Sequence, residues 1–133
     1  NKYFNNDLVL EKWFQMMASI NINDKGLEIV KSLLIHPKFD FKSPNKIRSV
    51  LGSFQKNNVE LFHANDETGY NFFIKNVMKI DKVNPQVSAR LIKPFTMFDN
   101  YKLNRKNKMK KYLRNIVKNN PSKDLFEVVH KAI

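Results

Sequence analysis

Two arginines, Arg48 and Arg90, are the residues whose type and spacing best suit a binding chemistry. Each follows a helix-capping side chain (Ser43 and Asn84) and a proline by about one helical turn. A guanidinium offers paired N–H donors that fit a carboxylate, a phosphate or a peptide carbonyl. Gln86 lies four residues before Arg90 and therefore shares its helix face. The pattern favours a polar, ligand-facing surface, although each arginine could equally satisfy a carbonyl or a carboxylate within the fold.

The two proline-initiated segments are about 40 residues apart, which is the period of a two- or three-helix solenoid repeat. Equivalent positions of such repeats stack along one surface. Because Arg48 and Arg90 lie at nearly matching depths behind their caps, we expect them to face one groove.

Motifs for catalysis are absent from the sequence. There is no cysteine, and the three glycines are isolated, so no thiolate metal site and no phosphate-binding loop is present. The histidines lie too far apart for an H-E-x-x-H zinc helix; they are His36, His63 and His130. We therefore predict no catalytic residue and no metal ligand in this chain, and a structural, hydrogen-bonded role for His63.

Helices must position these side chains, because apolar residues recur at i, i+3 and i+4 along the chain and no convincing period-2 strand occurs. The low glycine count, three in 133 residues, also argues against a turn-rich β fold. The expected helices cover Leu8–Ser19, Asn23 or Asp24 to His36, Ser43 to Phe54, Asn58 to Phe62 with Asn58 as the candidate cap, a helix that follows Gly69 and runs through Ile80, Asn84 to Phe95 with a kink or early end at Pro94, Asn104–Lys118, and Ser122 to Ile133. The predicted fold is all-α: a superhelical HEAT/ARM-like solenoid fragment of seven or eight helices, with no linker that would divide residues 1–133 into domains.

The positive charge is concentrated near the C-terminus. Residues 101–133 hold 10 of the 24 basic residues and only two of the 12 acidic ones. One interpretation is a solvated, lysine-rich outer surface. The alternative is a basic HEAT-like module that binds nucleic acid or a protein; its residues would be Lys102, Arg105, Lys106, Lys108, Lys110, Lys111, Arg114 and Lys118. No DNA- or RNA-binding motif accompanies these residues, so nucleic acid is not the expected partner.

Four ordered blocks resemble the C-terminal end of bacterial aminopeptidase N, a zinc metalloaminopeptidase family. Asp7–Phe14 resembles its D-x-V-x-x-K-W-F stretch, and Asn45–Ser49 resembles its N-x-I-R-S segment. Phe62–Tyr70 is similar to its F-H-A…G-Y pattern, and Asn84–Pro94 to its N-P-Q-V…R-L-I-x-P block. The resemblance runs from about Asp7 to the C-terminus with similar gaps throughout.

The resemblance implies that residues 1–133 are the last part of a helical-repeat domain that caps the active site. The catalytic domain, with its H-E-x-x-H and G-x-M-E-N segments and its zinc, would lie upstream and outside this chain. Gln86 matches a position in the pocket for the substrate's first side chain. Arg48 and Arg90 match arginines that line the cavity near the substrate's C-terminal side.

Further expectations follow from this resemblance. The parent enzyme would remove N-terminal residues from peptides, whereas the fragment alone would be inactive. Its partners would be the upstream catalytic domain and peptide substrates, and the isolated fragment would tend to self-associate through the apolar end left by missing repeats. No apolar run approaches the ~20 residues needed to span a bilayer, and we expect a cytoplasmic protein, in solution or peripheral to the inner membrane.

Overall fold

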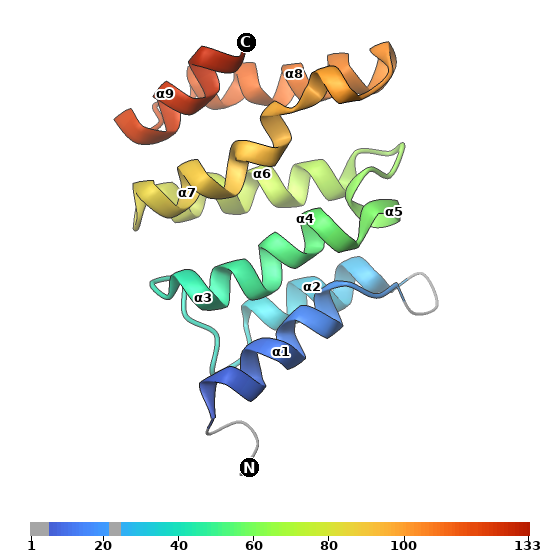
Figure 1. The fold of residues 1–133 in the computed structure, drawn as a ribbon, viewed down its shortest axis with the longest axis vertical. Helices are drawn as coiled ribbons and strands as arrows, with labels where there is room; N and C mark the ends of the chain where they lie inside the picture. Colours follow the sequence, from blue (N-terminus) through green and yellow to red (C-terminus); the bar gives the residue numbers. More distant parts are fainter. Residues whose placement is uncertain (1–5, 22–24) are drawn as a thin grey trace. The chain divides into compact units, whose positions relative to one another are not determined.

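The computed structural model describes residues 6–21 and 25–133, and all of their regular secondary structure is helical (Figure 1). The elements are α1 (Asp7–Ala18), α2 (Gly26–Leu34), α3 (Pro44–Ile47), the π-helix η2 (Arg48–Gly52), α4 (Ser53–Asn57), α5 (Val59–Phe62), α6 (Thr68–Asp81), α7 (Pro85–Ile92), the 3₁₀-helices η3 (Lys93–Thr96) and η4 (Phe98–Asn100), α8 (Leu103–Lys118) and α9 (Lys123–Ala132). With α3, η2 and α4 counted as one continuous segment, the described chain has eight α-helical segments, as predicted. The expected cap of α2 at Asn23 or Asp24 lies outside the described residues.

The chain forms two compact units, Asn1–Phe73 and Ile74–Ile133. The boundary falls inside helix α6, which runs through it without a break. Each unit has its own set of packed helices. No helix among the described residues combines the length and apolarity needed to cross a membrane.

In the first unit, α1 packs on α2 and on the segment formed by α3, η2 and α4 (Figure 1). Asn6 caps α1, because its side-chain oxygen accepts hydrogen bonds from the amides of the first turn. The face of α1 that turns inward buries Leu10 and Phe14 completely. Lys46, at the start of α3, adds ion pairs of 3.1 Å to Asp7 and 3.6 Å to Glu11 on α1.

The third predicted helix is confirmed, but its centre is not α-helical. Ser43 caps α3 through a 3.3 Å bond from the Lys46 amide, as predicted from the Ser-Pro pair. The helix then widens into π geometry from Arg48 to Gly52 before α4 resumes. Such π turns are uncommon inside helices and are often found at functional sites.

Asn58 does not cap α5, contrary to the sequence-based prediction. Its side-chain oxygen caps no amide of α5. Its Nδ2 instead donates 3.1 Å bonds to the carbonyls of Ala18 and Ile20, at the end of α1. The side chain is buried, so these bonds to distant backbone satisfy a polar group that would otherwise be costly to bury.

Gly69 lies in the first turn of α6, where the backbone of α5 comes very close. A Cβ at this position would lie 2.2 Å from the carbonyl oxygen of Leu61 and 2.6 Å from that of Phe62. Only glycine fits this contact without movement of the backbone. The helix begins at Thr68, so Gly69 lies inside it and does not precede it as predicted.

In the second unit, α7 packs on α9, and α9 in turn packs on α8 (Figure 1). Asn84 caps α7 through a 3.3 Å bond from the Val87 amide. The α-helix ends at Ile92, two residues before Pro94, and continues as the 3₁₀ turn η3. The early end predicted from Pro94 is thus confirmed, and its cause is the loss of one backbone donor and a steric clash with the preceding turn.

A buried carboxylate joins three parts of this unit. Asp81, at the end of α6, is 5% exposed. It accepts 2.7 Å bonds from the Ser88 hydroxyl on α7 and from the Ser122 amide, and a 2.5 Å bond from the Ser122 hydroxyl. Ser122 is also the N-cap of α9, because its Oγ accepts from the Leu125 amide. Asp81 thereby fixes where α7 and α9 begin relative to α6.

Candidate functional site

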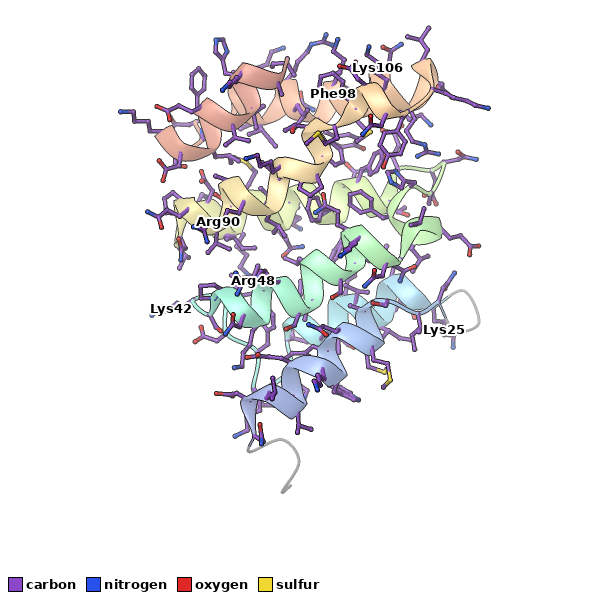
Figure 2. The ribbon with its side chains drawn as sticks, in the orientation of Figure 1. Lys25, Lys42, Arg48, Arg90, Phe98 and Lys106 are labelled. Carbon is purple, nitrogen blue, oxygen red and sulfur yellow. The ribbon has the colours of Figure 1, made fainter. Side chains whose placement is uncertain are left out.

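Arg48 occupies the first position of the π-helix and is exposed. Its guanidinium donates to the side-chain oxygen of Asn45, one turn earlier on the same segment. Its neighbours Ile47 and Ser49 are buried, so the backbone that carries Arg48 is held by the core of the first unit. Figure 2 labels Arg48 on this segment. The backbone of Arg48 is therefore held in place, while its guanidinium stays accessible to solvent and ligands.

Gln86 and Arg90 are both exposed and lie one turn apart on α7, as their spacing predicted. The other residues of this helix after Pro85 and Gln86 face the core of the second unit; they are Val87, Ser88, Ala89, Leu91 and Ile92. Figure 2 labels Arg90 on α7. Because the inward face is packed, Gln86 and Arg90 face solvent, where a ligand can reach them.

The two arginines differ in their local geometry. Arg48 follows its cap, Ser43, by five residues and lies in π geometry, whereas Arg90 follows Asn84 by six residues within an α-helix. Their depths are therefore close but not equal. They also belong to different units, so their stacking along one groove stays a prediction.

The buried face of α7 holds the helix in place and so positions Gln86 and Arg90 on its exposed side. Ser88, which is fully buried, bonds to Asp81 and to the Pro85 carbonyl at 2.9 Å. Gln86 and Arg90 flank this anchor in the sequence. The carboxylate of Asp81 thus supports the side of α7 opposite to the exposed polar residues. Nothing in the sequence singles out Asp81, because Ser122 is 41 residues away.

Each histidine makes hydrogen bonds or ring contacts within the fold. His36 accepts a 3.0 Å bond at Nδ1 from the Lys38 amide and packs on Phe14. His63 shares a hydrogen bond with the hydroxyl of the buried Tyr70, which agrees with the structural role predicted for it. His130 stacks on Phe126 with the ring centroids 4.9 Å apart.

The described residues contain no group of three or more histidine, cysteine, aspartate or glutamate side chains that could hold a metal ion. A zinc ion of the kind that the sequence resemblance implies does not fit the side chains described for this chain, since structural and catalytic zinc sites need at least three protein ligands.

The lysine-rich segment forms α8 and its flank. Lys106 pairs with Asp99 at 2.6 Å, and this hydrogen bond and charge hold the pKa of the Asp99 carboxyl below its usual range. Lys106 and Lys110 also lie over the ring of Phe98, at 5.9 and 5.3 Å from its centroid; Figure 2 shows Phe98 and Lys106 close together. The apolar side of α8 is buried, including Met109 and Leu113. Among the charged residues of α8, Lys111, Arg114 and Lys118 are exposed.

Lys93 is a further candidate binding residue, which the sequence analysis of Arg48 and Arg90 did not identify. It is exposed and follows Arg90 by three residues, at the junction of α7 and η3. The signal that could have found it is this spacing, because a residue three positions on shares a helix face.

The helices and their order define an all-α protein built from ARM-type repeats. The chain belongs to the family described as "Domain of unknown function (DUF3458_C) ARM repeats", which matches residues 1–133. This match confirms the predicted fold class.

Curated relatives agree with the resemblance found in the sequence. The chain is 40% identical over 133 residues to Aminopeptidase N of Haemophilus influenzae. This match covers 99% of this chain and 15% of that protein. It is 37% identical over 134 residues to Aminopeptidase N of Escherichia coli, covering 100% of this chain and 15% of that protein. The predicted similarity to the C-terminal region of aminopeptidase N is therefore confirmed.

A solved structure has a similar fold. The crystal structure of Legionella pneumophila aminopeptidase A in complex with aspartic acid matches 98% of this chain and 15% of its own, with a TM-score of 0.89 and 33% sequence identity. The chain thus spans about 15% of the length of the relatives that it matches.

Proposed function

We propose that this chain is the C-terminal part of a zinc-dependent aminopeptidase, in which it caps the active site and lines the substrate cavity. The observation that carries the proposal is the similarity of the whole chain to the C-terminal region of aminopeptidase N. The reaction is hydrolysis of the peptide bond after the N-terminal residue, in the service of peptide turnover. Zinc and the catalytic residues belong to an upstream domain of the same longer protein, and this chain contributes none.

Three exposed side chains are proposed to contact the substrate. Gln86 borders the pocket for the first side chain of the peptide. Arg90 and Arg48 hold carbonyl or carboxylate oxygens further along the peptide, because a guanidinium binds two oxygens in a planar fork. Their exposure and their packed helix backbones support this role. The enzyme that contains them is proposed to work in the cytoplasm, in solution or peripheral to the inner membrane.

The test compares two arginine variants in the full-length enzyme. Arg90→Ala should lower kcat/KM for a short peptide, because a charge-assisted contact is lost. The decrease should correspond to a loss of about 1–3 kcal/mol of transition-state stabilisation. Arg114→Ala is the matched control, since Arg114 is an exposed arginine on α8. Equal kinetics for Arg90→Ala and the control would contradict the role in the cavity.

The 133-residue chain alone is expected to hydrolyse no aminopeptidase substrate, with or without added zinc. It supplies no zinc site among its described residues. Release of a free amino acid by the purified chain, at a rate above that of a buffer blank, would contradict the assignment of catalysis to the upstream part. Sedimentation of the same sample tests the expected self-association.

A further inference from the structure

Helix α7 and the start of η3 expose a narrow polar stripe, formed by Gln86, Arg90 and Lys93. These positions are separated by four and three residues, which places them within an arc of roughly 60° on a helix of 3.6 residues per turn. Lys93 keeps helical backbone angles, φ −55° and ψ −46°, so the spacing holds through this residue. The three polar side chains therefore extend from the same side of one helix.

The stripe is positively charged and contains no acid. From Pro85 to Thr96 the sequence has no aspartate or glutamate. In the described part of this unit, no carboxylate forms an ion pair with Arg90 or Lys93. Helix α9 packs on α7, and its acids, Asp124 and Glu127, are both exposed. Two adjacent cations thus keep their hydrogen-bond donors available for an anion.

We propose that Lys93 is a fourth substrate-binding residue, and that Arg90 and Lys93 together bind the C-terminal carboxylate of short peptides. The inference rests on the proposed function, since it assumes a peptide in the adjoining cavity. The guanidinium of Arg90 takes the carboxylate oxygens in a fork, and the ammonium of Lys93 adds a second positive charge from the same side. Gln86, one turn earlier, offers an amide that can bond to the preceding peptide group.

This arrangement makes the enzyme selective for peptide length. An extended peptide grows by about 3.3–3.6 Å per residue, so its carboxylate reaches a fixed pair of cations at only one or two lengths when its N-terminus is held for cleavage. A peptide of that length with a free carboxylate is favoured over the same peptide with a C-terminal amide. The preference disappears for peptides that are too short or too long.

The experiment uses the full-length enzyme with matched peptides of two to six residues, each as the free acid and as the amide. We expect the acid to exceed the amide in kcat/KM by roughly three- to tenfold at the favoured length, mainly through a lower KM. Lys93→Met should remove most of this preference, because the KM of the acid rises toward that of the amide. Lys93→Arg should retain it. Lys118→Met, at an exposed lysine of α8, is the control and should leave the ratio unchanged.

Two failures are distinguishable. If the enzyme cleaves these peptides but the acid-to-amide ratio is one at every length, or is the same in Lys93→Met as in the wild type, the inference about Lys93 is overturned and the proposed function stands. If the zinc-loaded full-length protein releases no N-terminal residue from any peptide, the proposed function fails, and the inference fails with it.

Discussion

Removal of the Asp81 carboxylate should weaken the second unit more than any change on its surface. This side chain is 5% exposed and accepts three hydrogen bonds, from the Ser88 hydroxyl and from the amide and hydroxyl of Ser122. The bonds connect the end of α6 to α7 and to the start of α9. Asp81→Ala breaks all three contacts and leaves the buried donors to find other partners.

The magnitude follows from what each donor can still do. The Ser88 hydroxyl keeps a bond to the Pro85 carbonyl, so its loss is partial. The Ser122 amide loses its acceptor entirely. Because bonds to a charged group contribute more than neutral ones and burial of the charge has its own cost, we expect Asp81→Ala to lower the free energy of unfolding by about 2–4 kcal/mol.

Asp81→Asn should cost less, about 1–2 kcal/mol. The asparagine oxygen can still accept from the Ser122 amide, while its NH₂ takes the place of the oxygen that faces the two hydroxyls. Ser88 can accept from this NH₂ because its own proton goes to Pro85. Ser122 can also accept, but its proton then lacks an acceptor at this position.

The assay combines two measurements on the 133-residue chain. Urea denaturation followed by far-UV circular dichroism gives the free energies, with Glu127→Ala as the control at an exposed position of α9, where a change within about 0.5 kcal/mol is expected. Hydrogen exchange reports the Ser122 amide directly. It should exchange slowly in the wild type and much faster in Asp81→Ala. If Asp81→Ala unfolds like the control and the Ser122 amide exchanges at the wild-type rate, the reasoning is refuted.

Three further predictions concern caps, close packing and titration. Gly69→Ala should lower the free energy of unfolding by about 1–3 kcal/mol, since its Cβ would lie 2.2 Å from a backbone oxygen of α5; an unchanged urea midpoint would contradict this. Ser43→Ala and Asn84→Ala should each cost about 1 kcal/mol as lost N-caps, whereas Gly in place of either should cost only a few tenths. The backbone and side-chain donors of Thr68 lower the pKa of Asp66, so the interaction stabilises the fold above the ordinary aspartate pKa and is lost as the pH falls through the depressed value. In an NMR titration of the Asp66 carboxyl carbon, Thr68→Val should move the transition to higher pH, and no movement would exclude the hydroxyl as a cause.

Local rules predicted most of the helices correctly, because their signals lie within one turn of the chain. The side chains of Ser43 and Asn84 cap helices as their position before proline suggests. Pro94 ends the α-helical part of α7 for the steric reason that applies to any internal proline. The apolar stripe of α8 is buried as its period of 3.6 residues indicates.

The errors involve contacts between residues far apart in the sequence. Asparagine is a residue type typical of N-caps, but the side-chain NH₂ of Asn58 donates to carbonyls at the end of α1, 38 to 40 residues away. The π turn that begins at Arg48 has no signature in a pattern of apolar spacing. The role of Asp81 requires knowledge that α7 and α9 meet, which no local pattern contains.

The candidate site was predictable in part. Spacing alone placed Gln86 and Arg90 on one exposed face of a helix, and the structure agrees. The same rule extends to Lys93, which is recognised only once the helix is known to continue with helical angles up to that residue. Whether Arg48 joins the same surface depends on the arrangement of two units, and spacing along one helix cannot predict it.

The most direct test of the central claim is to sequence the source gene upstream of Asn1. If this chain is the end of a zinc aminopeptidase, the same reading frame encodes a G-x-M-E-N segment, then H-E-x-x-H, and then a more distal glutamate that completes the zinc ligands. A reading frame that starts close to Asn1 would contradict the claim, because the chain would then have no catalytic domain to cap.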